Sequence, residues 1–549
     1  MDIGVVLVGL VWLAGTLYRI YRQARFFQIE EYMNGRYLRW VVSRRERWLP
    51  GRTLLAFAAG VIFSFLLTEA PGTFMLTIIG VVSAAVAVWP RSEGEIKKVF
   101  RPTNRAKRLL GGAVLVALFD LALYLFIAGR LPLPAVTELQ FIVIAVIGLI
   151  LFLTAPVILV GGNLLMTPVE AFFRARFVNQ ARNVLKEIDP TVIGITGSYG
   201  KTSTKTYLSH ILNGRYKAFP TPKSYNTMMG VCIAINNGLK GDYRTDYFIC
   251  EMGAYIPGEI ERIADLTHPR ISVVVEVGPQ HLERFGTLEN IAIAKYEIIK
   301  ALPPDGVGIF NWDNPYVREM YERGYPQTRL AVSKTADPAN PPPGGPRLIA
   351  SAIEESLDGL RFTVTDTLDG QSERFETPLL GGHNVTNILL ATAIALHEKM
   401  SLKEVARRVR GLQPAESRLV KQTSPEGITI INDAYSANPV GIVHALRVLS
   451  MHTGGRRLLI TPGMVELGPL QEQENRKLGE IAAQHATDVI LVGAAQTHPI
   501  KDGLLSAGFA PERVLTVETL KESVAWYQGN LKPGDTVLFL NDLPDTYSS

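Results

Sequence analysis

The residues best suited to chemistry lie close together in the stretch GITGSYGKTSTKT, residues 194–206. Gly197 and Gly200 allow backbone conformations in which N–H groups approach phosphate oxygens. Lys201 follows to reach the outer phosphates, and Thr202 offers a hydroxyl to Mg²⁺. The pattern G-x-x-x-x-G-K-[ST] also has a glycine six residues before the lysine, where this chain has isoleucine. The stretch predicts a phosphate-binding loop, with an ordinary strand-to-helix turn as the alternative.

Apolar residues on both sides of this loop predict the elements that position it. Residues 192–196 are typical of the end of a buried parallel strand. A 3.6-residue spacing predicts a helix that ends near Gly214, and its apolar stripe is Tyr207, Leu208, Ile211 and Leu212. Because a helix N-terminus carries a partial positive charge, the lysine and threonine would open the helix where an anion binds best.

Two further strand ends carry polar side chains. The apolar stretch 246–251 ends in Glu251, and the stretch 271–277 predicts another buried strand that is followed by Gly278, Pro279, Gln280 and His281. The carboxyl ends of parallel strands meet at one edge of a sheet, which is where such folds hold Mg²⁺. Glu251 is therefore a candidate metal ligand, and His281 is expected at the same edge.

Lys295 occupies an unusual position for a lysine. The predicted helix over residues 288–302 has the apolar stripe Ile291, Ala294, Ile298 and Leu302, and Lys295 falls on that stripe. A buried lysine needs a partner or a covalent change that alters its charge. The alternative is a lysine that extends its ammonium group to water from a partly exposed helix.

The composition points to a large chain with an unusual first third. Its 549 residues predict three or four domains, and the apolar excess behind the mean hydropathy of +0.15 lies in residues 1–165. Cys232 and Cys250 have no C-x-x-C spacing, which argues against a disulfide framework or a zinc site. Residues 19–52 and 91–108 carry more basic charge than the net +5 of the whole chain. General binding to nucleic acid is therefore not indicated.

The first 165 residues are predicted to form a membrane domain of about five transmembrane helices. A cleaved signal peptide is not expected, because the arginines follow the first apolar run. The two basic segments fall on one side, so the positive-inside rule places the N-terminus outside and everything after residue 161 in the cytoplasm. The second and third stretches could instead form a re-entrant hairpin through Pro71 and Gly72. The five apolar stretches are 3–18, 54–67, 74–89, 109–128 and 141–161.

Two other segments accompany this domain. Residues 18–49 are rich in arginine and aromatic residues, which suggests an amphipathic helix on the inner leaflet or, alternatively, a solvated loop. Residues 166–188 predict a helical connector to the cytoplasmic part.

Ordered motifs across residues 190–470 resemble the Mur ligases, the ATP-dependent amide-forming enzymes of peptidoglycan assembly. The similarity is greatest to their D-alanyl-D-alanine-adding branch. The motifs are TGSYGKTST, EMGAYIPGEI, GPQHLERFGTLENIAIAKYEI, NWDNPYV, GGHNVTN and INDAYSANP, in the family's order. The resemblance implies an α/β fold behind the membrane helices. A central P-loop ATPase domain with a parallel sheet would span residues 189–378, and a Rossmann-like C-terminal domain would span residues 379–549.

The resemblance also implies roles for individual residues. The catalytic set would be Lys201, His281 and Lys295. Phosphate contacts would come from Gly197, Ser198, Gly200, Lys201, Thr202 and Ser203. The rest of the nucleotide would meet Asn311, Asp313, Arg418, Asp433, Tyr435 and Asn438. Two Mg²⁺ ions would be held by Thr202, Glu251, His281 and Lys295, the last as a carbamylated lysine. Substrate contacts would come from Thr221, Asn226, His383 and Asn387, although turn or capping roles are the alternative for the residues near the domain junction.

The implied activity is ATP-dependent ligation. The enzyme would phosphorylate a carboxylate of a cell-envelope precursor, UDP-linked or lipid-linked, and an amino acid or dipeptide would displace the phosphate. The nearest known activity is that of UDP-N-acetylmuramoyl-tripeptide:D-alanyl-D-alanine ligase, and the site would lie on the cytoplasmic side of a bacterial-type inner membrane. The alternatives are an amide ligase of the poly-γ-glutamate type and a catalytically idle membrane scaffold.

Three departures from the family pattern concern the substrate. Membrane stretches stand where the soluble family has a domain for the UDP part of its substrate. The substrate loop TPKSYNTMMG retains Thr221 and Asn226 without a run of asparagines. The final strand is followed by residues 541–545 instead of a Lys-Gly-Ser-Arg-like end.

Overall fold

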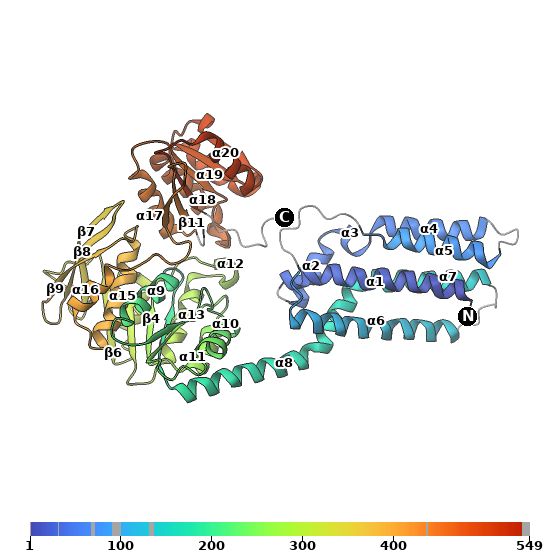
Figure 1. The fold of residues 1–549 in the computed structure, drawn as a ribbon, viewed down its shortest axis with the longest axis horizontal. Coiled ribbons are helices and arrows are strands. Elements are labelled where there is room, and N and C mark those ends of the chain that lie inside the picture. The colour runs from blue at the N-terminus through green and yellow to red at the C-terminus, as the bar shows by residue number, and fades with distance from the viewer. Residues whose placement is uncertain are drawn as a thin grey trace. The chain divides into compact units, whose positions relative to one another are not determined.

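The computed structural model describes residues 2–30, 32–66, 72–90, 100–130, 137–434 and 437–540. The chain forms two compact units, which divide between Arg176 and Phe177. This boundary falls inside one long helix, α8 (Ala155–Ile188) (Figure 1).

The first unit is a helical bundle. Among the described residues, three helices are long and apolar enough to cross a membrane by length and composition, namely α1 (Ile3–Ile29), α6 (Asn104–Arg130) and α8, which continues into the second unit. Three shorter apolar helices accompany them: α4 (Gly51–Leu66), α5 (Thr73–Val88) and α7 (Thr137–Leu153). The predicted membrane domain therefore has its apolar helices, and the number of spans stays a prediction.

The last predicted span, residues 141–161, is not one helix. The helix breaks at Thr154, between α7 and α8. Proline lacks a backbone N–H, so Pro156 cannot donate to the carbonyl of Phe152 in the helical pattern. That carbonyl instead accepts a hydrogen bond of 2.7 Å from Nη1 of Arg19 on α1. The predicted connector, residues 166–188, is likewise no separate element but the continuation of α8, with Pro168 inside it.

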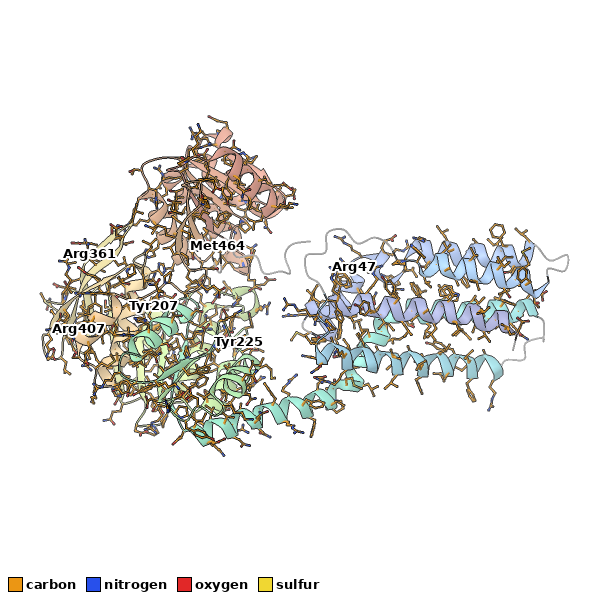
Figure 2. The ribbon with its side chains drawn as sticks, in the orientation of Figure 1. Arg47, Tyr207, Tyr225, Arg361, Arg407 and Met464 are labelled. Atoms are coloured by element: carbon orange, nitrogen blue, oxygen red, sulfur yellow. The ribbon has the colours of Figure 1, made fainter. Side chains whose placement is uncertain are left out.

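The arginine-rich and aromatic residues 18–49 do not form one amphipathic helix. α1 continues to Ile29, and two short helices follow, α2 (Asn34–Val42) and α3 (Arg45–Trp48). Tyr37 of α2 is buried, and its hydroxyl donates to Oε1 of Gln23 on α1 over 2.8 Å. Trp40 stacks on Phe26 at 4.1 Å, and the guanidinium of Arg47, labelled in Figure 2, lies 4.1 Å from the Trp40 ring. These aromatic side chains pack within the unit, because α2 folds back against the end of α1.

Helices α4 and α5 are direct neighbours. The hydroxyl of Thr53 donates to the carbonyl of Ala87 over 2.8 Å, and a Cβ on Gly60 would come within 2.6 Å of Ser83. Pro71, at which the re-entrant hairpin was predicted to turn, lies outside the described residues. The re-entrant hairpin stays a prediction.

The second unit begins with a nine-stranded sheet in the order β2-β3-β1-β4-β5-β6-β7-β8-β9. Pairing is parallel from β2 to β7 and antiparallel through β8 and β9. The strands are β1 (Thr191–Thr196), β2 (Ala218–Pro220), β3 (Tyr247–Glu251), β4 (Ile271–Val274), β5 (Val307–Asn311), β6 (Thr328–Ser333), β7 (Leu348–Ser356), β8 (Gly359–Asp366) and β9 (Ser372–Thr377).

Helices cover both faces of this sheet, as a buried parallel sheet requires. One apolar core includes α9 (Lys201–Leu212), α15 (His383–His397) and α16 (Leu402–Val409). The other includes α10 (Met228–Ala234), α11 (Glu259–Thr267), α13 (Leu288–Lys300) and α14 (Pro315–Glu322). β1 lies between β3 and β4. The strand order therefore reverses at β1, because β2 and β3 lie on one side of it and β4 and β5 on the other. Ligands bind such folds at this switch point, beyond the carboxyl end of β1.

A six-stranded sheet follows, in the order β10-β11-β15-β12-β13-β14, with all pairs parallel except β10–β11. The predicted fold class, apolar helices followed by two mostly parallel α/β sheets, is confirmed. The strands are β10 (Val420–Thr423), β11 (Thr429–Asp433), β12 (Arg457–Thr461), β13 (Asp488–Val492), β14 (Val514–Val517) and β15 (Thr536–Leu540). The helices are α17 (Pro439–Ser450), α18 (Gln471–His485), α19 (Ala494–Ser506) and α20 (Leu520–Asn530). Because α15 and α16 pack on the first sheet, the second sheet begins later than the domain start predicted at residue 379.

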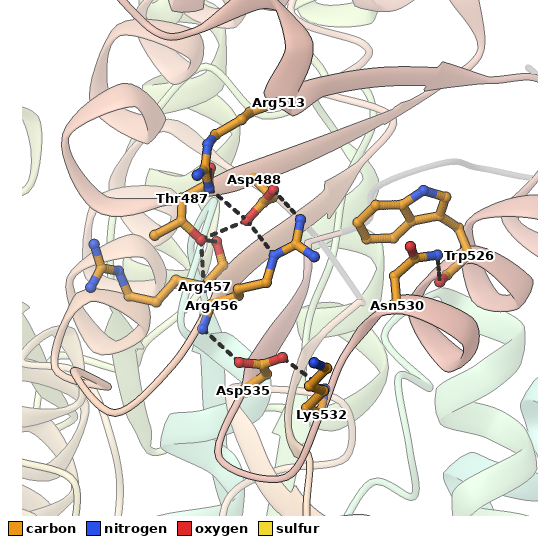
Figure 3. Close-up of polar contacts among 9 residues, drawn as sticks. All are labelled: Arg456, Arg457, Thr487, Asp488, Arg513, Trp526, Asn530, Lys532 and Asp535. Atoms are coloured by element: carbon orange, nitrogen blue, oxygen red, sulfur yellow. Dashed lines mark hydrogen bonds and ion pairs between the residues drawn. The ribbon is translucent and has the colours of Figure 1, made fainter.

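A charged network closes the amino end of this second sheet (Figure 3). Asp488, at the start of β13, accepts hydrogen bonds from Arg456 at 2.5 and 3.0 Å and from the Thr487 hydroxyl at 2.8 Å. Asp535 accepts from the backbone N–H of Arg456 over 2.7 Å. The network lies at the amino ends of the strands, away from the edge where ligands bind. Its role is to join strand ends.

Candidate active site

The predicted loop follows β1 and turns sharply into α9. Gly200 has φ 78° at the N-cap of α9, and a Cβ there would lie 2.5 Å from Oδ1 of Asn387. Gly197 has φ 152°, and a Cβ there would lie 2.9 Å from the backbone N of Glu276. Ile195, at the position where the common pattern has glycine, is fully buried inside β1. The loop thus needs glycine at two positions, and the isoleucine fits the buried strand.

Ser198 fastens the loop to the chain that follows β4. Its hydroxyl donates to the carbonyl of Gly278 over 2.9 Å and accepts from the N–H of Gly278 over 3.0 Å. Its own backbone N–H donates to the carbonyl of Glu276 over 2.7 Å. Ser203 is buried on the first turn of α9. The loop is therefore held in shape by the neighbouring strand connection.

Lys201 is the first residue of α9, and its ammonium group lies inside the loop. Nζ donates to the carbonyls of Gly197 and Ser198 over 2.6 and 3.1 Å. Burial lowers the pKa of Lys201 to about 8, with Arg418 acting in the same direction and Glu251 opposing it. Its charge is thus poorly solvated, which favours an anion as a partner.

Thr202 and Glu251, both predicted as magnesium ligands, lie side by side. The Thr202 hydroxyl is 3.2 and 3.1 Å from the two carboxylate oxygens of Glu251. Thr221 and Asn226, predicted to contact substrate, also hold this acid. The backbone N–H of Glu251 donates to the Thr221 hydroxyl over 3.1 Å, and Nδ2 of Asn226 donates to Oε1 of Glu251 over 3.2 Å.

Sequence reasoning missed Lys205, the closest cation to Glu251. Its ammonium group lies 2.8 Å from Oε2 of Glu251, and both side chains are almost fully buried. Burial alone would raise the pKa of Glu251, but the charges of Lys205 and Lys201 lower it below the usual range. Lys205 follows Lys201 by one helical turn and so lies on the same face of α9. The four-residue spacing of the two lysines was the sequence signal that could have identified Lys205.

His281 precedes the short helix α12 (Leu282–Phe285) in a left-handed conformation with φ 56°. Its Nδ1 is hydrogen-bonded to Oε2 of Glu466, from the part of the chain that forms the second sheet. The Tyr255 ring lies 4.5 Å from the imidazole. Burial lowers the pKa of His281, although Glu466 acts in the opposite direction. Glu466 is a second residue that the sequence reasoning missed.

Lys295 is buried on α13, as its place on the apolar stripe predicted. Only 3% of the residue is exposed, and its ammonium group lies 5.8 Å from the centre of the Phe285 ring. Within the described ranges no carboxylate pairs with it. Burial, assisted by the charge of Lys201 and opposed by Glu297 and Glu259, lowers the pKa of Lys295 to about 7. In a substantial fraction of the protein molecules, Lys295 therefore carries a neutral amine near neutral pH.

Of the two nucleotide residues predicted around the end of β5, Asn311 contacts Glu276, together with Asn314, which was not predicted. Nδ2 of Asn311 donates to Oε2 of Glu276 over 3.0 Å, and Nδ2 of Asn314 donates to Oε1 over 2.5 Å. Asp313 accepts from the backbone N–H of Lys334 over 2.8 Å and so fixes the chain after β6. Glu276 was not among the predicted residues.

The residues predicted to come from the C-terminal part are only partly assembled at the loop. Arg418 lies within electrostatic range of Lys201 and of Asp433. Burial raises the pKa of Asp433 to about 6, opposed by Arg418 and by a hydrogen bond from the Leu419 N–H. Asn438 caps α17 by accepting from the N–H of Gly441 over 2.8 Å, which is the alternative role foreseen for it. Tyr435 lies outside the described residues.

Asn387 and His383 lie on α15. Asn387 accepts a hydrogen bond from the Thr204 hydroxyl over 3.3 Å and lies against the loop at Gly200. His383 is buried with its ring 5.1 Å from that of His444, and its Nδ1 has no hydrogen-bond partner in the described part of the chain. Asn387 therefore supports the phosphate loop, whereas His383 packs against His444.

Comparison with known proteins agrees with this geometry. Residues 195–395 match the Mur ligase middle domain, and residues 417–541 match the Mur ligase glutamate ligase domain. The chain is 32% identical over 371 residues to UDP-N-acetylmuramoyl-tripeptide--D-alanyl-D-alanine ligase of Mycobacterium bovis, covering 63% of this chain and 69% of that protein. The chain belongs to the Mur ligase family.

Two other relatives support the same assignment. The corresponding ligase of Bacillus subtilis is 29% identical over 360 residues, 65% of this Mur ligase and 74% of the relative. The crystal structure of MurF from Acinetobacter baumannii superposes with a TM-score of 0.58 and 25% identity, covering 67% of this chain and 77% of that one. The predicted family and the MurF-like resemblance are confirmed, and this Mur ligase is an ATP-dependent ligase.

A small cavity of about 60 Å³ lies where the central sheet's loops meet the C-terminal part of this Mur ligase. Its lining residues are Tyr199, Gln280, His281, Ala437, Asn438, Val465, Glu466 and Leu467. Residues from both parts therefore border the loop that carries Lys201.

The donor set around the loop suits Mg²⁺. Mg²⁺ in nucleotide sites keeps several waters and takes one or two carboxylate ligands beside the phosphates. Thr202 and Glu251 supply one hydroxyl and one carboxylate at contact distance. No group of three or more His, Cys, Asp or Glu residues that could hold a metal occurs in the described ranges, so this site would depend on the nucleotide for further ligands.

Proposed function

We propose that this Mur ligase joins an amino acid or short peptide to the carboxylate of a lipid-linked cell-envelope precursor at the cytoplasmic face of a membrane. The observation that carries the proposal is the helical unit ahead of the matched domains. The family match begins at residue 195, and the preceding part contains three helices long enough to cross a membrane. An enzyme anchored in this way would meet acceptors that are themselves held in the membrane.

The chemistry follows from the residues around the loop. The γ-phosphoryl group of ATP passes to an oxygen of the acceptor carboxylate, which gives an acyl phosphate and ADP. The amine then attacks the carbonyl carbon, inorganic phosphate leaves, and the amine loses a proton. Both partners of the first step are anionic, so the ammonium group of Lys201 reduces their repulsion. Mg²⁺ held by Thr202 and Glu251 would supply further positive charge.

Lys295 is proposed to carry a carbamate. Carbamylation requires the neutral amine to attack CO₂, and the burial that lowers the pKa of Lys295 to about 7 provides that form near neutral pH. The product is an anion beside the cationic Lys201, which replaces a repulsive pair by an attractive one. The purified protein given ¹³C-bicarbonate should show a carbamate signal by ¹³C NMR that Lys295→Met lacks. An unchanged signal in the variant would refute the assignment.

One experiment tests which amine donor and which carboxylate acceptor the enzyme uses. Full-length protein in detergent, with ATP, Mg²⁺ and bicarbonate, is given UDP-muramoyl-tripeptide or its lipid-linked form. Each acceptor is paired with D-alanyl-D-alanine, single amino acids or glutamate. We expect ADP release with the lipid-linked acceptor. Release with the UDP-linked acceptor alone contradicts the proposal, and repeated addition of glutamate would instead indicate a poly-γ-glutamate-type ligase.

A further inference from the structure

A cluster of arginines lies at one end of the helical bundle, away from the ligase site in sequence. We define the arginine cluster as Arg105 and Arg108 of α6 with Arg174 of α8. Glu170 of α8 is its acid: it accepts from Nε and Nη2 of Arg108 at 2.6 and 3.0 Å. Arg105 and Arg174 form no ion pair among the described residues, and Glu170 acts on both only at longer range.

Within the arginine cluster, Arg105 has the surroundings that most favour binding of an anion. Its guanidinium lies 4.1 Å from the centre of the Tyr32 ring, and its Nε is buried without a hydrogen-bond partner in the described part of the chain. Arg108, Arg174 and Glu170 all lie within electrostatic range of it. A guanidinium that stacks on an aromatic ring and has no ion-pair partner among the described residues is suited to bind a phosphate oxygen.

The surroundings of Arg105 are fixed by packing. Nδ2 of Asn163 on α8 donates to the carbonyl of Tyr32 over 3.3 Å, and Nε2 of Gln28 donates to the Tyr32 hydroxyl over 3.1 Å. Helices α6 and α8 approach closely at two glycines, since a Cβ on Gly112 would lie 2.8 Å from the carbonyl of Gly162. The site is therefore built from α6, α8 and the turn between α1 and α2, which are held in contact.

An apolar surface lies next to the cluster. Phe172 and Phe173 on α8 are 62% and 44% exposed, and the Arg108 guanidinium lies 4.7 Å from the Phe173 ring. Basic groups beside exposed aromatic side chains at the end of a transmembrane bundle favour a ligand with both a phosphate and an apolar tail. A soluble phosphate would contact the basic groups but not the exposed aromatic side chains.

We propose that the arginine cluster binds the phosphate group of a lipid at the inner leaflet. Under the proposed function, on which this inference builds, the ligand would be the diphosphate of the lipid-linked acceptor. A bulk anionic phospholipid offers the same chemistry. In either case Arg105 and Arg174 bind phosphate oxygens, and the tail lies along Phe172 and Phe173.

The test measures lipid binding and needs no turnover. Full-length protein in neutral detergent is titrated with a short-chain polyprenyl diphosphate, phosphatidylglycerol, a polyprenyl alcohol of equal length and inorganic diphosphate, and bound lipid is counted by native mass spectrometry. We expect the two phosphate-bearing lipids to bind and the alcohol and inorganic diphosphate to bind at least about tenfold more weakly. Tighter binding of the polyprenyl diphosphate identifies the acceptor as the source, and equal binding identifies the phospholipid.

Variants locate the site. Arg105→Gln with Arg174→Gln should weaken phosphate-lipid binding by about tenfold or more, and Arg174→Gln alone, on an exposed side chain, should weaken it without affecting folding. The matched control is Arg39→Gln with Arg44→Gln, which removes two exposed charges from α2 and the residue before α3 and should leave binding unchanged. Equal losses in control and test variants, or binding of the alcohol as tight as that of the diphosphate, would overturn the proposal. ADP release with the UDP-linked acceptor alone would refute the proposed function and leave these binding results standing.

Discussion

The Thr202 hydroxyl lies within 3.2 Å of both carboxylate oxygens of Glu251. The two residues are far apart in sequence, yet the parallel pairing of β1 with β3 places Ile195 opposite Glu251 and so brings the strand end to the start of α9. This contact joins the phosphate loop to the acid that would hold the metal.

Thr202→Val tests the hydroxyl directly. Valine keeps the shape of the side chain but cannot bind a metal or donate to Glu251, so we expect a loss of about 10² in the rate of Mg²⁺-dependent ADP release. Thr206→Val is the matched control, because Thr206 lies on the same helix and donates only to the Thr202 carbonyl at 2.8 Å. Similar losses in both variants would show that the effect arises from helix packing.

Lys205→Met should destabilise the central domain. It leaves the buried carboxylate of Glu251 without its closest cation, and removing one partner of a buried ion pair costs about 3–5 kcal/mol. Urea unfolding would measure the change. Lys217→Met removes the exposed pair with Asp242 and should cost less than about 1 kcal/mol. Equal stabilities of the two variants would contradict the assigned role of Lys205.

Glu466→Gln should loosen the contact between α12 and the C-terminal part. The glutamine cannot form the charged contacts that Glu466 makes with His281 and, at 3.3 Å, with Arg284. Hydrogen exchange of residues 282–285 should become faster, whereas Glu472→Gln, at an exposed position on α18, should leave it unchanged. Unaltered exchange in Glu466→Gln would show that other contacts hold this junction.

Asp488→Asn should lower the stability of the C-terminal part and remove a pH dependence. Burial alone would raise the pKa of Asp488, but the Arg456 and Thr487 hydrogen bonds lower it. A carboxyl whose pKa is lower in the folded state adds stability above its unfolded pKa, and that stability is lost as the pH falls below about 4. We expect a cost of about 1–3 kcal/mol at neutral pH and a smaller cost in acid. A pH-independent cost would refute the charged role.

Part of the fold was not predictable from local patterns. The apolar stretches predicted the helices of the first unit. The break at Thr154 depends instead on Pro156 and on the carbonyl of Phe152, which Arg19 of α1 binds. The aromatic residues of 18–49 have the composition of a membrane surface helix. The burial of Phe27 and Tyr37 depends on α2 folding back onto α1, which a one-dimensional pattern does not contain.

Local sequence patterns were sufficient to predict the glycine-containing loop after β1, the acid at the end of β3 and the burial of Lys295. Each depends on glycine spacing or on apolar periodicity within one element. The side chains that contact these residues could be identified only from the folded structure. Lys205 pairs with an acid 46 residues away, and Glu466 contacts a histidine 185 residues away. Such contacts arise when strand order and helix packing bring distant segments together, and that arrangement is set by burial of whole surfaces rather than by any short motif.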